Sequence, residues 1–115
     1  MALIMKILGA NTITGTEMAL TPSAQASKCL LVKNVLLTNT GTGLASLEIY
    51  VKRGSSGAAF QIAPKPITIP AGTQFVLDSE ITLNLNTTNV EVIYGKFSTG
   101  TGAVDSVVNG FERDI

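Results

Sequence analysis

Short apolar runs, separated at regular intervals by Gly, Thr, Ser and Asn, follow one another along most of this chain. The clearest run is Ala45–Arg53, in which Leu47, Ile49 and Val51 alternate with polar positions that include Tyr50. Because successive side chains of a β-strand point to opposite faces, this run predicts a strand with a buried face and a polar face that exposes Tyr50. Repeated short strands with turns between them are typical of an antiparallel sandwich. We therefore expect an all-β fold, a jelly-roll-like or Ig-like antiparallel β-sandwich of about seven or eight strands with an N-terminal strand and arm.

Two runs carry signals for irregular points in the predicted sheets. The long apolar run Cys29–Asn39 is interrupted by Lys33 and Asn34, which predicts a bulge or bend where the strand changes its partner. Prolines on both sides of Ile67–Ile69 disfavour a central position, because proline cannot donate to a neighbouring strand, and they predict an edge. The motif IPAG at Ile69–Gly72 predicts a turn, in which proline fixes one φ angle and glycine frees another.

The C-terminal run Val104–Ile115 has a length that suits a helix or a strand. Its valines and Gly110 are poor helix formers, so we expect a strand with a possible bulge at Gly110. The run ends on the charged residues Glu112, Arg113 and Asp114. These form either a solvated terminus or a docking tail whose alternating charges set the register with another subunit.

The N-terminal region divides into a regular and an irregular part. Ala2–Leu8 reads as a first strand, and Ala10–Ser27 has no regular pattern. Ile13, Met18 and Leu20 are too many apolar residues for a solvated loop, so we expect an arm that buries them on its own sheet or on a neighbouring chain. Removal of residues 2–20 should then leave a folded sandwich and weaken assembly.

The length of 115 residues predicts one sandwich domain, 1–115, with the strand and arm at 1–27 and the sandwich body at 28–115. The N-terminus resembles a signal peptide only weakly, because Lys6 lies inside the apolar stretch rather than before it. We expect synthesis in a cytoplasm without export by the usual route. No segment approaches the roughly 18 apolar residues that cross a bilayer, so no membrane partner is expected.

The low charge of the chain bears on its partners. Charged residues make up 14% of the sequence, and eight basic residues cancel eight acidic ones. Nucleic acid is not expected as a partner, because phosphate binding needs a local density of Lys and Arg. A weakly charged surface suits a free monomer poorly, so either partners cover part of it, or its many Thr, Ser, Asn and Gln keep it soluble. The single cysteine, Cys29, is expected in the core.

Catalytic chemistry finds little support in the sequence. There is no histidine, which removes the commonest general base and most zinc and copper sites. Asp78 and Glu80 could share a face and bind a cation, but they lie between two predicted strands and read better as a polar connection. We therefore expect no enzyme activity, no cofactor and no metal.

Several motifs resemble small β-sandwich structural proteins of tailed bacteriophages. The likeness covers Lys33–Ile115 and rests on the stretches VKNVLLTNTGTGLASLEIYVKRG, ITIPAGTQFVLDSEITLN, NVEVIYGKF and NGFERDI. It implies a virion protein that decorates or cements the capsid, or alternatively a component of the neck, tail or baseplate. It also implies other virion proteins as partners, namely the major capsid protein or tail and neck proteins, and a homo-oligomer such as a trimer. A different possibility is a receptor-binding or glycan-binding module on a fibre, in which an exposed Tyr50 would stack on a sugar.

The predicted contact residues come from the first strand and arm, the polar strand face and the charged C-terminal segment. They are Leu3, Ile4, Ile13, Met18, Leu20, Tyr50, Phe111, Glu112 and Arg113.

Overall fold

A computed structural model describes residues 3–22, 28–54, 57–78, 80–85, 90–98 and 102–114, without the side chains of Leu3, Ile4 and Asp114. Within these ranges the chain forms ten strands and no helix, which confirms the all-β prediction. The strands are β1 (Leu3–Ile13), β2 (Met18–Ala19), β3 (Lys28–Asn39), β4 (Ala45–Arg53), β5 (Ala59–Gln61), β6 (Ile67–Ile69), β7 (Gln74–Leu77), β8 (Ile81–Asn84), β9 (Glu91–Phe97) and β10 (Val104–Asp114). The described residues thus include no helix long and apolar enough to cross a membrane.

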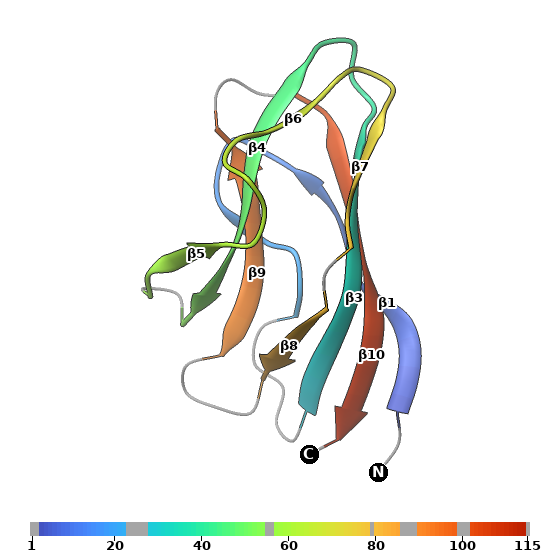
Figure 1. Ribbon diagram of the computed structural model, residues 1–115, viewed down its shortest axis with the longest axis vertical. Coiled ribbons are helices and arrows are strands. Elements are labelled where there is room, and N and C mark those ends of the chain that lie inside the picture. The colour runs from blue at the N-terminus through green and yellow to red at the C-terminus, as the bar shows by residue number, and fades with distance from the viewer. Residues whose placement is uncertain are drawn as a thin grey trace.

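The strands form two antiparallel sheets that pack as a sandwich (Figure 1). The first sheet has the order β1-β10-β3-β7, and β8 also pairs with β3. The second has the order β2-β9-β4-β5, and β6 also pairs with β4. The antiparallel sandwich predicted from the alternating runs is confirmed, and β6 is an edge strand, as its flanking prolines indicate.

The core lies between the two sheets and is aliphatic. Its largest fully buried side chains include Leu30, Leu37, Leu47, Ile49 and Ile93, each at most 1% exposed. In β4 the buried Leu47 and Ile49 occupy one parity, as the sequence pattern predicts. Burial of each such side chain contributes about 1.5–3 kcal/mol, so this shared interior holds the two sheets together.

The long strand β3 is irregular where the sequence predicts it. Asn109 of β10 pairs with Asn34, and the next residue, Gly110, pairs with Val32, so Lys33 is the extra residue of a β-bulge. On its other side β3 pairs with β8 before this point and with β7 after it. The predicted change of partner and the predicted bulge at Gly110 are therefore one feature, and the C-terminal segment is a strand.

The N-terminal segment is built into both sheets and is not an arm. β1 continues past the predicted end at Leu8 to Ile13, and β2 then pairs with β9 in the opposite sheet. Ile13 is 1% and Leu20 0% exposed. Gly95 of β9 makes room for them, because a Cβ there would lie 3.1 Å from Leu20 Cδ1 and 3.3 Å from Ile13 Cδ1. Of the two predicted alternatives, the structure therefore shows burial of Ile13 and Leu20 on this chain's own sheets rather than on a neighbour. Residues 23–27 lie outside the described ranges.

One end of the sandwich is fastened by a buried asparagine. Asn39 Nδ2 donates to the carbonyls of Gly43 and Ile69, each at 2.8 Å, and its Oδ1 accepts from the Gly41 amide at 2.9 Å. Its backbone carbonyl accepts from the amide of Gly72, whose φ of 72° confirms the predicted IPAG turn. A buried polar side chain with its bonds satisfied stabilises the loops that it joins, so this asparagine has a structural role.

Candidate interaction surface

The outward side of the first sheet is unusually apolar, and the alternation in β10 shows why. Val104, Ser106 and Val108 are buried. The intervening positions point away from the core, and two of them, Val107 and Phe111, are hydrophobic and half-buried. The strand therefore carries apolar side chains on both faces, although only one face meets the core.

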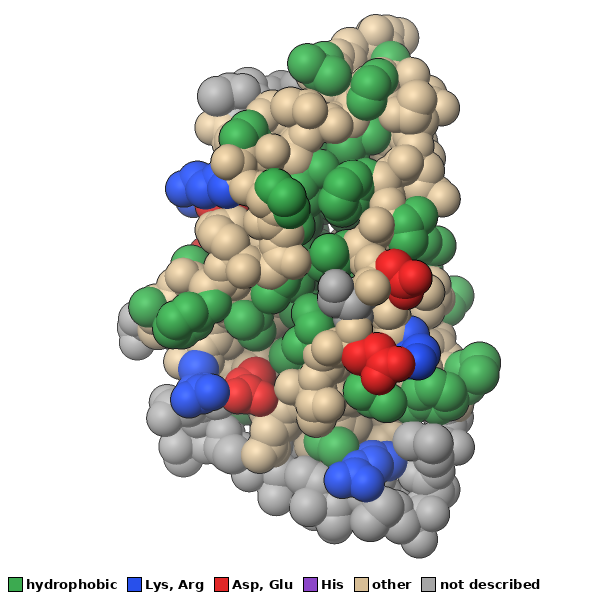
Figure 2. All heavy atoms as spheres, viewed as in Figure 1, with side chains coloured by type: hydrophobic (Ala, Val, Ile, Leu, Met, Phe, Trp, Pro, Cys, Tyr) green, Lys and Arg blue, Asp and Glu red, His purple; other side chains and the backbone are tan. Residues whose placement is uncertain are grey.

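The neighbouring strands extend this pattern into a continuous surface. Met5 is 74% exposed, Ile7 59% and Val76 48%. Figure 2 shows hydrophobic side chains reaching the right-hand boundary of the molecule, on the side of the sheet that contains β3, β10 and β1. We call this surface the apolar face; it consists of Met5, Ile7, Ala10, Leu31, Leu36, Val76, Val107 and Phe111.

The strand register arranges the apolar face in rows that run across the sheet. One row contains Met5, Phe111 and Leu31, and another contains Ala10, Val107, Leu36 and Val76. Contiguous exposed apolar patches on soluble proteins mark protein contacts or binding grooves. Among the described residues, the apolar face is therefore the candidate interaction surface.

A polar row separates the two apolar rows. Asn109 and Asn34 lie opposite each other in the register, and Asn109 Nδ2 donates to Asn34 Oδ1 at 2.9 Å. Each amide keeps further hydrogen-bonding capacity, namely the Asn109 oxygen and the Asn34 amino group. Ile7 of β1 lies on the other side of Asn109 in the same row, so the asparagine pair forms a polar centre, flanked by Ile7, between two apolar bands.

Charged residues lie at the two ends of the same face. Arg113 is exposed beyond the Phe111 row, and its Nε donates to Cys29 Sγ at 3.2 Å. Asp105 is exposed beyond the Val107 row and accepts a 2.8 Å hydrogen bond from Thr12 Oγ1. Cys29 is buried as predicted, but on the outward side of β3 opposite Arg113 and not within the core cluster. The face thus ends in a positive charge on one side and a negative charge on the other.

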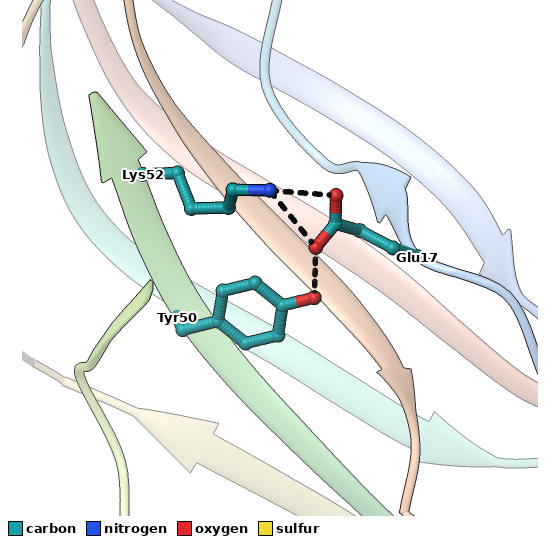
Figure 3. Close-up of polar contacts among 3 residues, drawn as sticks. All are labelled: Glu17, Tyr50 and Lys52. Atoms are coloured by element: carbon teal, nitrogen blue, oxygen red, sulfur yellow. Dashed lines mark hydrogen bonds and ion pairs between the residues drawn. The ribbon is translucent and has the colours of Figure 1, made fainter. Parts of the chain in front are cut away.

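The outward side of the second sheet has the opposite character. Tyr50 donates to the Glu17 carboxylate, and Lys52 Nζ lies 3.1 Å from Glu17 Oε1 (Figure 3). Tyr50 also stacks on Tyr94, with ring centroids 6.2 Å apart, and Lys52 Nζ lies 5.3 Å from the centre of that ring. The prediction that Tyr50 is an exposed anchor is wrong: it is 2% exposed, because this cluster covers its strand face.

The contacts of this cluster shift the pKa values of its members. The hydrogen bond from Tyr50, with a smaller contribution from Lys52, lowers the pKa of Glu17 and outweighs its partial burial. Burial and then the hydrogen bond to Glu17 raise the pKa of Tyr50 above its ordinary value. Both shifts stabilise the pair as carboxylate and neutral phenol, so the cluster binds the β1–β2 connection to β4.

A second group on this side is also paired within the chain. Glu48 is 8% exposed; its Oε1 accepts from Gln61 Nε2 at 3.3 Å and lies 3.8 Å from Lys65 Nζ. Glu91 pairs with Arg53 at 3.1 Å, but both have the inward parity of Ile93, and Glu91 Oε1 accepts from the amide of Asn84 in the opposite sheet. The carboxylates of Glu17 and Glu48 on this polar side therefore have partners in their own chain.

The remaining predicted contact residues are divided by the sheet geometry. Phe111 and Arg113 face outward, whereas Glu112 takes the opposite parity and pairs with Lys6 at 3.3 Å and Lys28 at 3.7 Å. The C-terminal charges therefore set the register within this chain, through Glu112. Met18 is half-buried against the core, and the side chains of Leu3 and Ile4 lie outside the described part.

Sequence analysis missed the residues that make the face broad. These are Met5, Ile7, Ala10, Leu31, Leu36, Val76 and Val107. A usable signal existed in β10 and β3, where consecutive valines and leucines place apolar side chains on both parities. The exposure of Met5 and Ile7 depends on β1 being at the edge of its sheet, which the sequence does not reveal.

No cation site emerges near the acidic pair. Glu80 Oε1 lies 2.6 Å from Lys33 Nζ, so this carboxylate is engaged by the bulged lysine. Among the described residues, no three or more Cys, Asp or Glu side chains are placed to hold a metal ion.

Comparisons with known proteins add information on the fold. No protein-family model and no curated protein matches the sequence. The chain is similar to the Drosophila NLP core, a structure described for pentamer formation and histone binding, with 16% identity, a TM-score of 0.51 and coverage of 95% of this chain and 100% of that one. It is also similar to a Bacillus endospore appendage protein of disulfide-linked pili, with 13% identity, a TM-score of 0.51 and coverage of 98% and 88%.

A structure of infectious bursal disease virus is more distant. It has 14% identity and a TM-score of 0.44, and the match covers 96% of this chain and 30% of that one. At these identities the two closer likenesses show the sandwich fold alone, and the viral one supports no inference.

Proposed function

We propose that this chain is a non-enzymatic structural protein of a tailed-phage virion, which binds the capsid as a decoration or cement protein and stabilises the head. The observation that carries the proposal is the apolar face, a sheet surface whose Met5, Ile7 and Val76 are exposed. A protein that acts by surface contact needs such an area, and its binding strength comes from apolar side chains buried on assembly.

Two further features agree with a structural role. The carboxylates of Glu17 and Glu48 on the opposite side of the sandwich are engaged within the chain, so they add stability rather than chemistry. The resemblance of Lys33–Ile115 to small phage sandwich proteins supplies the virion setting. The same resemblance includes neck, tail and baseplate proteins, which are the alternative location.

The glycan-binding alternative loses the residue on which it depended. A ring that stacks on a sugar must be accessible, and Tyr50 is covered by its own cluster. We therefore do not propose a carbohydrate site.

Localisation on purified virus particles tests the proposal. Quantitative mass spectrometry gives the copy number per particle, and gold-labelled antibodies with electron microscopy show the position. We expect many copies spread over the head. Label confined to the neck or tail would replace the cement role with the alternative location, and absence from purified particles would contradict a virion role.

A matched pair of variants tests the contribution of the apolar face. Met5 and Phe60 are both large, hydrophobic and exposed, at 74% and 64%, but Phe60 belongs to β5 in the other sheet. Added to particles that lack the protein, Met5→Gln should occupy fewer sites than wild type, and Phe60→Gln should occupy as many. If Phe60→Gln occupied fewer sites than Met5→Gln, the apolar face would not be the surface that binds the particle.

A further inference from the structure

We propose that the apolar face is a self-association site at which a second copy of this chain packs face to face. The two-fold axis that relates the copies lies between the two sheets, passes over Asn109 and runs perpendicular to the strands. This inference concerns the chain in solution and does not depend on a virion role. It goes beyond the proposed function because it names the molecule that covers the face before assembly; on the particle the capsid takes the place of the second copy, so the two contacts compete for one surface.

The symmetry of the residues along β10 carries the proposal. Counted from Asn109, Val107 and Phe111 are each two positions away, and Asp105 and Arg113 are each four positions away. All five point outward, since they alternate with the buried positions. A two-fold axis through Asn109 therefore places the Phe111 row of one copy on the Val107 row of the other.

Charge complementarity selects the direction of that axis. With the axis perpendicular to the strands, Asp105 of each copy lies opposite Arg113 of the other, about 14 Å from the centre at about 3.4 Å per residue. An axis parallel to the strands would instead place Arg113 near Arg113 and Asp105 near Asp105, which is repulsive. The net charge of zero adds no general repulsion between copies.

The asparagine row supplies a polar contact at the centre. The Asn34–Asn109 pair of one copy meets the same pair of the other, and each pair retains a donor and an acceptor. A single polar pair within an apolar interface can fix register, because a shifted pairing would leave it without hydrogen bonds. The arrangement therefore favours one alignment of the two sheets.

The size of the face suits a stable pair. Three strands of 11 or 12 residues, with the four-residue β7 and β8 along the side of β3, cover roughly 37 by 19 Å, or about 700 Å², at about 4.8 Å between strands. A standard protein interface buries about 800 Å² per partner. Two sheets packed in this way lie about 10 Å apart, with strands crossing at about 30°.

The other exposed hydrophobic residues do not form a surface that could pair with the apolar face. A ring assembly joins two different patches, whereas a two-fold pair joins a patch to itself. The other large exposed hydrophobic residues in the described part are Leu44, in a loop, and Phe60, on a short strand of the opposite sheet. Neither forms an area that could match the apolar face, so its apolar counterpart is a second copy of the face.

Edge-to-edge pairing through β1 is the competing arrangement. β1 is an edge strand, but it carries a bulge at Leu8 and the inward-facing charge of Lys6. Inward charges and bulges are the features that block pairing at a sheet edge. The structure therefore favours contact through the face over contact through the edge.

Charge reversal tests the geometry directly. We would measure the mass of the purified protein by light scattering at several concentrations for wild type, Asp105→Arg, Arg113→Asp and the double variant. Wild type should form a dimer. Each single variant should dimerise about tenfold more weakly, because two attractive pairs become repulsive, and the double variant should regain wild-type affinity. Thermal unfolding of each variant controls for stability, since Asp105 and Arg113 also bond within the chain.

The outcomes separate the possibilities. A wild-type monomer at all concentrations, a trimer, or a double variant weaker than either single variant would overturn the proposal. So would hydrogen exchange in which the amides of β1 become protected on association, since that result indicates edge pairing. None of these results depends on whether the chain is found on a virus particle, so a failure here is distinct from a failure of the proposed function.

Discussion

The two outer faces of the sandwich differ in how far their side chains are paired or covered by other residues of the same chain. On the outer side of the β2-β9-β4-β5 sheet, Glu17 and Glu48 each pair with a lysine, and Tyr50 is covered. On the β1-β10-β3-β7 side, Met5, Ile7 and Val76 have no such cover. The charged face looks more like a functional site in the sequence, yet its groups are engaged internally. The comparison therefore makes the exposed apolar surface, rather than the charged surface, the place where we propose that this chain contacts another.

The comparison of the two faces requires that the N-terminal strands β1 and β2 belong to the two sheets. The substitution Leu20→Ala tests this requirement and should have the largest effect on folding. Leu20 is fully buried against Ile13 and Gly95. Truncation of a buried leucine to alanine costs about 2–5 kcal/mol. Urea unfolding followed by circular dichroism should show this loss. A change below about 0.5 kcal/mol would restore the arm interpretation.

A smaller loss is expected for Tyr50→Phe on the polar side. The substitution keeps the ring and removes the hydroxyl that donates to Glu17. A hydrogen bond to a charged group contributes about 1.5–3 kcal/mol when buried, and the partly exposed Glu17 reduces this to about 1 kcal/mol. Unfolding experiments measure the loss, and light scattering should show unchanged self-association. Weaker self-association would mean that both faces take part in assembly.

The pH dependence of the same pair gives a subtler effect. The pKa of folded Glu17 is lowered from its ordinary value of 4.5, chiefly by the hydrogen bond from Tyr50. Its contribution to stability is therefore full above the unfolded pKa and is lost as the pH falls through the folded pKa. The difference in unfolding free energy between wild type and Glu17→Gln should be constant above about pH 5.5 and shrink below about pH 4.5. A difference that grows on acidification would contradict the assigned contact.

The smallest effect on folding is expected for Ile7→Thr on the apolar face. Ile7 is 59% exposed, so the change in folding free energy should stay within about 0.5 kcal/mol. Self-association should nevertheless weaken, because the side chain is buried only in the pair. Concentration-dependent light scattering measures this, with Phe60→Thr as the control. Equal weakening by both variants would indicate nonspecific association.

Local features were predictable where a single residue type dictates them. Four such features follow from residue chemistry: the change of partner at Lys33 and Asn34, the bulge at Gly110, the edge position of β6 and the IPAG turn. Strand alternation also placed Leu47 and Ile49 in the core. The number of strands was underestimated, because β2, β5 and β6 are each two or three residues long.

The errors concern contacts between residues distant in sequence. Tyr50 has the parity of an exposed residue, and it is buried only because Glu17 and Tyr94 come from other segments. Ile13 and Leu20 look like part of an irregular arm because the residue they pack over, Gly95, lies in a strand that is distant in the sequence. Glu112 and Arg113 are adjacent in the sequence but face opposite sides of the sheet, one toward Lys6 and the other outward. Such relations depend on sheet order, which periodicity does not specify.

Hydroxyl-radical footprinting of side chains tests the central claim most directly. Met5 and Phe111 report on the apolar face, Tyr94 on the polar side, and the exposed Phe60 on the edge of the second sheet. Comparison of dilute protein with the assembled form should show reduced oxidation of Met5 and Phe111 and unchanged oxidation of Tyr94 and Phe60. Protection of Tyr94 and Phe60 with Met5 unchanged would contradict the account, because it would place the contact on the opposite face.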